Sequence, residues 1–146
     1  IRDRHLDGEY VFDCDGKDNL ILNVLIGGIV LDWSVHYYSS KKNVIALIRG
    51  DRPDLQLGAM QSGGNVKSIV LTKGIKPIEY VMYEAKKQEI PLILVKTDTH
   101  ETAQLIPELV SKSNFDHVLK LEKMTDLLST NFDINNFKKS FDISTL

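Results

Sequence analysis

Four apolar runs rich in β-branched residues constrain the fold more than any other feature of the chain. They span residues 22–30, 44–48, 68–71 and 92–95. Each run is nearly continuous in apolar residues, which is typical of strands buried on both faces of a parallel sheet. The last three begin at residues 44, 68 and 92, a spacing of 24 that suits one strand, one crossover helix and two short loops. The spacing therefore predicts strands that alternate with helices.

Between the apolar runs, the pattern changes to the period of an amphipathic helix. In residues 77–88 the apolar positions follow i, i+3, i+4 and i+7, and Pro77 suits the first turn of a helix. Asp98 and Glu101 have the spacing of a capping box that opens a helix at 98–112. Further helices are predicted at 54–61 and 122–130. The chain is therefore predicted to be α/β, a three-layer, Rossmann-like fold with a mainly parallel sheet of four or five strands flanked by helices.

The two ends of the chain are less regular than its middle. Residues 1–21 carry charges with weak periodicity, which predicts a lead-in segment with a short edge strand at 10–12, followed by a single α/β domain at 22–146. Residues 115–119 suit a short fifth strand, and Asp133 can cap a last short helix. The chain begins with Ile1 rather than Met, so we expect it to be a piece of a longer protein.

The composition of the chain argues against several kinds of partner. Its 146 residues suit one domain, and a net charge of −2 gives no reason to expect nucleic acid or an anionic membrane as a partner. No apolar run is long enough to span a bilayer. The single cysteine, Cys14, excludes an internal disulfide and predicts a reducing compartment, the cytoplasm.

Polar and cationic residues gather in the loops that follow the predicted strands, at 49–54, 72–77 and 96–100. The carboxyl ends of parallel strands meet at one edge of an open sheet, and ligands bind there, near a switch in strand order. Helix N-termini at the same edge favour anions. The candidate ligand-binding residues are Asp51, Arg52, Asp54, Thr72, Lys73, Gly74, Thr97 and Asp98.

Two of these loops resemble the two-part signature of the DRTGG domain family. The matching segments are residues 50–54 (GDRPD) and 70–74 (VLTKG), and residues 97–103 are similar to the stretch that follows in the family. The resemblance covers roughly residues 19–141. It implies a non-catalytic module that dimerises or transmits an effector signal. Such domains occur inside long phosphate acetyltransferases and beside CBS domains in regulated pyrophosphatases. The implied partners are a second copy, other domains of the parent polypeptide and a small anionic ligand, and no cofactor is implied.

The sequence departs from the family signature at one position. The family has Thr-Gly-Gly where this chain has Thr72, Lys73 and Gly74. A glycine at the second position takes a positive φ freely and lets a ligand approach the backbone, whereas a lysine adds a charge. Ligand binding that depends on the glycine pair is therefore expected to differ in this chain.

The candidate residues also have a structural interpretation, and both interpretations stay open. Asp51 can cap the helix that Pro53 starts, and Asp54 suits its first turn. Arg52 can pair with either carboxylate or across a dimer interface. The Thr72 hydroxyl and the Lys73 ammonium group can contact either a phosphate or solvent, and Asp98 suits a helix cap.

The sequence supports no catalytic residue and no metal site. The loops lack the spacing of a P-loop, no serine lies in a G-x-S-x-G context, and the four histidines are scattered without metal-ligand spacing. Cys14 is flanked by two aspartates, which disfavour a thiolate. The aromatic residues Trp33, Tyr37 and Tyr38 are expected to pack on the sheet or to serve a subunit interface.

Three functions follow from these observations. The first is a non-catalytic regulatory and dimerisation module, part of a phosphate acetyltransferase-like multidomain protein, that binds a small anionic effector. The second is an α/β enzyme domain that uses Asp51, Arg52 and Lys73 on a phosphorylated or acylated small substrate. The third is a scaffold whose ligand site has decayed, as the lysine in place of a glycine suggests.

Overall fold

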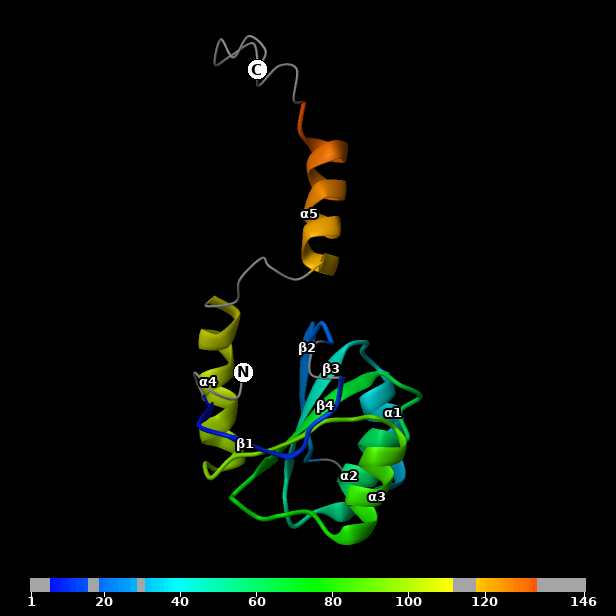
Figure 1. The fold of residues 1–146 in the computed structure, drawn as a ribbon, viewed down its shortest axis with the longest axis vertical. Helices are drawn as coiled ribbons and strands as arrows, with labels where there is room; N and C mark the ends of the chain where they lie inside the picture. Colours follow the sequence, from blue (N-terminus) through cyan, green and yellow to red (C-terminus); the bar gives the residue numbers. More distant parts are fainter. Residues whose placement is uncertain (1–5, 16–18, 29–30, 112–117, 134–146) are drawn as a thin grey trace. The chain divides into compact units, whose positions relative to one another are not determined.

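The computed structural model describes residues 6–15, 19–28, 31–111 and 118–133 (Figure 1). The chain forms two compact units, Ile1–Lys112 and Ser113–Leu146, and each is described by itself. The strands of the first unit are β1 Glu9–Phe12, β2 Asn23–Ile26, β3 Val44–Arg49, β4 Val66–Thr72 and β5 Leu92–Leu94. Its helices are α1 Leu31–Ser39, α2 Pro53–Met60, α3 Glu79–Lys87 and α4 Thr99–Ser111.

The strands form one five-stranded sheet in the order β1-β5-β4-β3-β2. Strands β2 to β5 are parallel and each pairs with the next in sequence, whereas β1 is antiparallel to β5. This confirms the predicted α/β fold with a mainly parallel sheet, because each of the four apolar runs overlaps one of the parallel strands. The regular spacing arises because α1, α2 and α3 each connect one parallel strand to its neighbour.

Successive side chains of the strands enter two separate cores. Val44, Ala46 and Ile48 of β3 belong to a core with residues of α2 and α3. Ile45 and Leu47 of the same strand belong to a second core, which includes residues of α4. Right-handed crossovers in one direction along a sheet place their helices on one face. Figure 1 accordingly shows α1, α2 and α3 on one side of the sheet and α4 on the other, the three layers that the sequence predicted.

Strand β1 lies in the segment expected to be a lead-in. The short edge strand predicted at 10–12 is confirmed, and its pairing with β5 contains an irregularity between Tyr10 and Phe12. Leu6, ahead of the strand, is buried in the core on the α4 side. The expected division into a lead-in of residues 1–21 and a domain of 22–146 stays a prediction.

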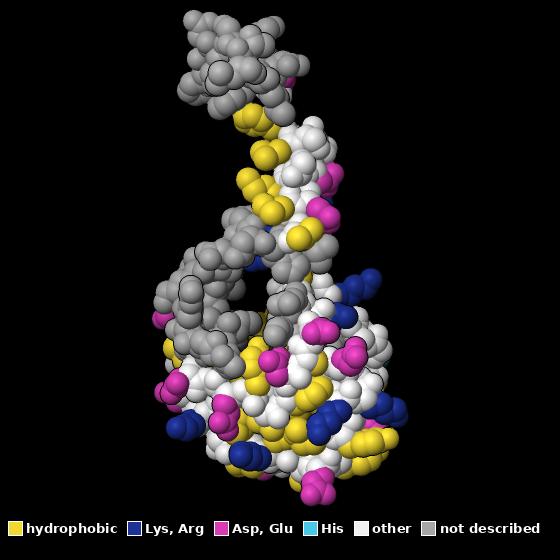
Figure 2. Space-filling view, viewed as in Figure 1, with side chains coloured by type: hydrophobic (Ala, Val, Ile, Leu, Met, Phe, Trp, Pro, Cys, Tyr) yellow, Lys and Arg dark blue, Asp and Glu magenta, His cyan; other side chains and the backbone are white. Residues whose placement is uncertain are grey.

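The second unit contributes one described helix, α5, Val118–Asn131. It confirms the helix predicted at 122–130. The fifth strand expected at 115–119 is wrong for Val118 and Leu119, which begin α5, and its other residues lie outside the described ones, as does the helix expected after Asp133. Hydrophobic side chains run along α5 (Figure 2), and they belong to Val118, Leu121, Met124, Leu127 and Leu128. No helix in the described ranges is long and apolar enough to cross a bilayer.

Candidate functional site

The loops that follow β3, β4 and β5 are joined by backbone hydrogen bonds. The N–H of Gly50 donates to the carbonyl of Thr72 at 3.2 Å, and the N–H of Lys73 donates to Thr97 at 2.8 Å. The N–H of Gly74 donates to Val95 at 2.8 Å. The structure thus brings the predicted signature loops together at the carboxyl edge of the sheet.

The helices that follow β4 and β5 show where neighbouring loops leave toward opposite faces of the sheet. The parallel strands lie in consecutive order, so the sheet has no reversal of strand order among β2 to β5. However, α3 follows β4 and packs in one core, whereas α4 follows β5 and packs in the other. The loops after β4 and β5 therefore leave toward opposite faces. In open α/β sheets, ligands bind where neighbouring connections diverge in this way.

Gly50 is required by a close approach of two loops. A Cβ atom at this position would lie 2.0 Å from the backbone oxygen of Ile75, which is far inside van der Waals contact. The glycine therefore lets the loop after β3 pack directly against the loop after β4. The sequence placed Gly50 in the signature but gave no sign of this contact, because Ile75 belongs to a different loop.

Two Arg–Asp pairs neutralise the loop after β3. Nε of Arg49 lies 2.9 Å from Oδ1 of Asp51, and its Nη2 contacts the other oxygen. Nε and Nη2 of Arg52 lie 2.9 and 2.7 Å from the two carboxylate oxygens of Asp54. Hydrogen bonds from these guanidinium groups are the main reason that the pKa values of Asp51 and Asp54 lie below their usual value.

The expected cap of α2 by Asp51 is wrong. The N-cap residue is Arg52, and no side chain makes a capping hydrogen bond there. The carboxylate of Asp51 is held by Arg49 instead, because a bidentate guanidinium is a stronger partner than a backbone N–H. The ion pair expected of Arg52 is confirmed with Asp54, and Pro53 occupies the first turn of α2 as predicted.

A buried glutamine on α2, Gln56, supports the same loop. Its Nε2 donates to the carbonyls of Arg49 and Gly50 at 2.9 and 3.0 Å. Its Oε1 has no hydrogen-bond partner in the described structure, and the same holds for the hydroxyl of Tyr38. Burial raises the pKa of the Tyr38 hydroxyl, so this group stays protonated. Gln56 was not predictable as a site residue from the sequence, because a glutamine within a helix is usually solvated.

Lys73 has a positive φ of 69°, and Gly74 follows with 64°. Lys73 therefore takes a left-handed conformation that a glycine would adopt freely. The Lys73 side chain is exposed and forms no ion pair within the described residues. Its charge makes a minor contribution to the lowered pKa values of two carboxyls, that of Asp51 after the hydrogen bond from Arg49, and that of Asp98 after backbone N–H groups.

A second lysine lies beside the same turn. A Cβ atom built on Gly74 would lie 3.9 Å from Cα and 4.0 Å from Cγ of Lys96. Gly74 is thus flanked by Lys73 in sequence and by Lys96 in space. Lys96 is in the loop predicted after the fourth run but was not among the candidate residues, because only the fold brings it next to Gly74.

The candidate hydroxyl groups are used within the protein. Oγ1 of Thr72 lies 2.7 Å from Oγ1 of Thr99, and Oγ1 of Thr97 lies 2.8 Å from Oγ1 of Thr102. Oδ1 of Asp98 accepts a hydrogen bond from the backbone N–H of Glu101 at 2.9 Å, which confirms the predicted cap of α4. These contacts tie the start of α4 to the end of β4. A ligand-binding role for these threonines and for Asp98 stays a prediction.

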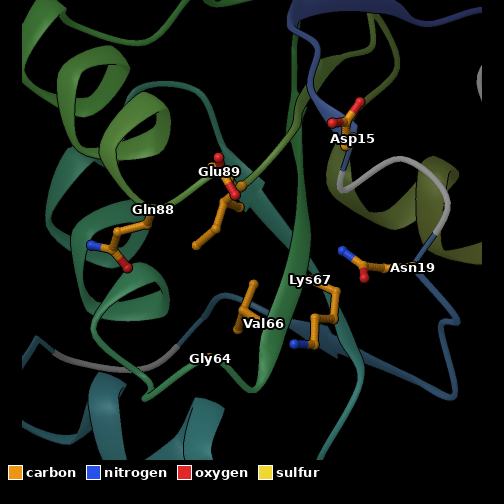
Figure 3. A pocket seen from close by; sticks show the side chains of 8 residues that line it. Asp15, Asn19, Gly64, Val66, Lys67, Gln88 and Glu89 are labelled. Carbon is orange, nitrogen blue, oxygen red and sulfur yellow. The ribbon is translucent and has the colours of Figure 1, made fainter.

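A separate cavity of about 380 Å³ lies at the opposite, amino edge of the sheet (Figure 3). It is lined by Asp15, Asn19, Gly64, Val66, Lys67, Gln88, Glu89 and Ile90. The candidate residues at the carboxyl edge are not among these. Within the described ranges, no group of three or more His, Cys, Asp or Glu side chains is placed to hold a metal ion.

The fold and the edge loops define a class of protein, an open α/β domain with antiparallel β1 at one edge and a glycine turn flanked by lysines. Within that class, the DRTGG domain family model matches residues 3–109, and the chain belongs to this family. A phosphate acetyltransferase of Synechocystis sp. (strain ATCC 27184 / PCC 6803 / Kazusa) is 29% identical over 111 residues, covering 71% of this chain. The match spans only 16% of that relative.

A solved structure has a similar fold. It contains the CBS and DRTGG domains of the regulatory region of Clostridium perfringens pyrophosphatase, complexed with the activator diadenosine tetraphosphate. The TM-score is 0.54 at 21% identity, and the similarity covers 69% of this chain and 42% of the other. This likeness supports the fold.

Proposed function

We propose that the chain is a non-catalytic regulatory module that dimerises and binds a small anionic effector in the cytoplasm. Its host is a multidomain protein of the phosphate acetyltransferase kind. The phosphate acetyltransferase relative supports this host, because the chain matches a small part of that longer protein. Support for regulation comes from the DRTGG-containing region that binds a nucleotide activator in the pyrophosphatase.

The observation that carries the effector site is the pair of lysines beside Gly74. The guanidinium groups of Arg49 and Arg52 are already paired with aspartates and have little capacity left for an anion. The ammonium groups of Lys73 and Lys96 form no ion pair within the described ranges. Lys73 follows β4 and Lys96 follows β5, and the backbone of Lys96 lies beside Gly74 where these loops diverge. Two flexible lysine side chains from this point can both reach a phosphate-bearing ligand.

Thermal unfolding in the presence of candidate ligands tests the effector site. We expect pyrophosphate, ATP or acetyl-CoA to raise the melting temperature, because a ligand at a hundredfold its Kd stabilises the native state by about 2.7 kcal/mol. Lys73→Ala and Lys96→Ala should each reduce the rise. Lys86→Ala, which removes an exposed lysine from α3, is the matched control and should leave it unchanged.

One observation favours a scaffold as the second candidate. The N–H groups of Lys73 and Gly74 and the hydroxyl of Thr72 are already hydrogen-bonded within the protein. They are therefore not free to bind a phosphate, unlike the N–H groups of a phosphate-binding loop. If none of the ligands shifts the melting temperature, the scaffold replaces the effector-binding module.

A further inference from the structure

The outer side of β2 is an open edge of the sheet. β2 pairs with β3 along Asn23–Ile26, and it is the last strand in the order. Within the described residues, no strand pairs with its other side. The carbonyl of Ile26 accepts the N–H of Gly28 at 3.1 Å. The other outward backbone groups of Val24 and Ile26 pair with no strand of the described residues and can pair with another chain.

The two edges of the sheet differ in how they are protected. The pairing of β1 with β5 is irregular between Tyr10 and Phe12, and β1 carries the exposed charge of Glu9. Irregularities and charges of this kind prevent further strands from adding. Residues 21–26, by contrast, contain neither charge nor proline. The amide of Asn23 is turned to its own chain, where Nδ2 donates to the carbonyl of Lys42 at 2.8 Å.

The unprotected edge also exposes apolar side chains. Leu25 packs against the core on the side of α1 to α3. The alternate residues Leu22, Val24 and Ile26 are 64%, 36% and 44% exposed. Helix α1, which follows β2, exposes Trp33 to 61%. Exposed apolar side chains beside an unpaired strand edge are typical of an interface and not of a strand edge exposed to solvent.

We propose that a second copy of this chain pairs with the open edge of β2, antiparallel to it, so that the sheets of two protomers join into one continuous sheet. This inference rests on the dimerisation named in the proposed function and specifies its interface. A two-fold axis places the same strand segment opposite itself. Because residues 21–26 carry no charge, this self-pairing brings no like charges together.

The area needed for a stable dimer favours this partner. Even if pairing buried the exposed parts of Leu22, Val24 and Ile26 completely, they would amount to on the order of 600 Å² for two copies, below the roughly 1,000 Å² of a specific interface. A two-fold axis through paired β2 strands also brings the two α1 helices side by side on one face. Trp33 can then supply apolar area that a single bound peptide strand would leave exposed.

Sedimentation of the full chain tests the interface. We expect a dimer at micromolar concentrations for the unaltered chain and a monomer for Val24→Lys, because two lysines then face each other across the axis. The Val24 side chain is exposed, so the circular dichroism spectrum should not change. The control is Ile78→Lys, which charges a residue of similar exposure ahead of α3 and should remain a dimer.

Mixing two variants provides a test specific to self-pairing. Val24→Lys and Val24→Glu should each be monomeric alone, and an equal mixture should form a heterodimer because the charges become complementary. If Val24→Lys remains a dimer, the β2 interface is overturned while dimerisation stands. If the unaltered chain is a monomer, both are overturned, and the effector site is judged separately by the thermal shifts.

Discussion

The backbone of Lys73 is held in a conformation that a lysine adopts only at a cost. A non-glycine residue in the left-handed region is destabilised by roughly 1 kcal/mol, and Lys73 lies there with a φ of 69°. We predict that Lys73→Gly raises the free energy of unfolding by up to about 1 kcal/mol, whereas Lys73→Ala leaves it nearly unchanged. Urea denaturation measures both. Equal stabilisation by the two variants would instead assign the effect to the lost charge.

Gly50 is expected to be intolerant of any side chain. The Cβ of an alanine would lie 2.0 Å from the Ile75 oxygen, so one of the two loops would have to move. We predict that Gly50→Ala lowers the free energy of unfolding by about 2–3 kcal/mol. Gly28→Ala is the control, because its Cβ would meet nothing within 4 Å. A change of less than about 0.5 kcal/mol for both variants would contradict the prediction.

The Arg52–Asp54 pair should make stability depend on acid pH. The folded protein lowers the pKa of Asp54, chiefly through the hydrogen bond from Arg52, so the pair stabilises the fold above the usual pKa of an aspartate. That contribution is lost as the pH falls through the lowered value. We predict that Asp54→Asn and Arg52→Gln each reduce the acid-induced loss of stability between about pH 5 and pH 2.

The measurement is the urea midpoint as a function of pH. Both variants should also be less stable than the unaltered chain at pH 7, by a small amount because the pair is partly exposed. An unchanged pH dependence in both variants would show that the pair does not contribute to acid stability. The sequence predicted an ion pair for Arg52 but not its partner, because Asp51 and Asp54 both lie within two residues of it.

At the scale of elements, β4 and α4 are joined by a partly buried pair of hydroxyl groups. Oγ1 of Thr72 and Oγ1 of Thr99 lie 2.7 Å apart, and Thr72 is fully buried. We predict that Thr72→Val and Thr99→Val each destabilise the fold by about 1 kcal/mol, with the double variant little worse than either. A double-mutant cycle by urea denaturation measures the coupling. Additive effects would mean that the two hydroxyl groups act independently.

The elements themselves were largely predictable from the sequence. The apolar runs of β3, β4 and β5 were predictable because a strand covered on both faces must be apolar at nearly every position. The first run also predicted a strand, but the expected burial on both faces is wrong for β2, since Val24 and Ile26 are exposed. The pairing of β1 with β5 was not predictable, since it joins residues far apart in sequence and depends on the finished sheet. The prediction of a strand at 115–119 is wrong for Val118 and Leu119, which begin α5, because a short apolar run suits a helix as well as a strand.

The candidate site was predictable only in part. The loops after the strands could be placed at one edge, because parallel strands end together. The role of each side chain could not be derived, since it depends on contacts between loops. Asp51 was expected at a helix cap and lies with Arg49, and Lys96 was not singled out until the fold placed it against Gly74.

At the scale of the whole molecule, the unit Ile1–Lys112 contains both cores. All residues of the two core clusters lie between Leu6 and Ile106. We predict that a fragment of residues 1–112 folds cooperatively, with a circular dichroism spectrum that shows both helix and strand and a single unfolding transition. A fragment that unfolds without a cooperative transition would show that residues beyond 112 are needed for the fold.

The consecutive order of β2, β3, β4 and β5 also bears on how the chain folds during its synthesis. Strands β3, β4 and β5 each pair with the strand made just before them, so the sheet can grow as the polypeptide leaves the ribosome. β1 is the exception, because its partner β5 is made about eighty residues later. Among the five strands of this sheet, β1 is therefore made first and paired last.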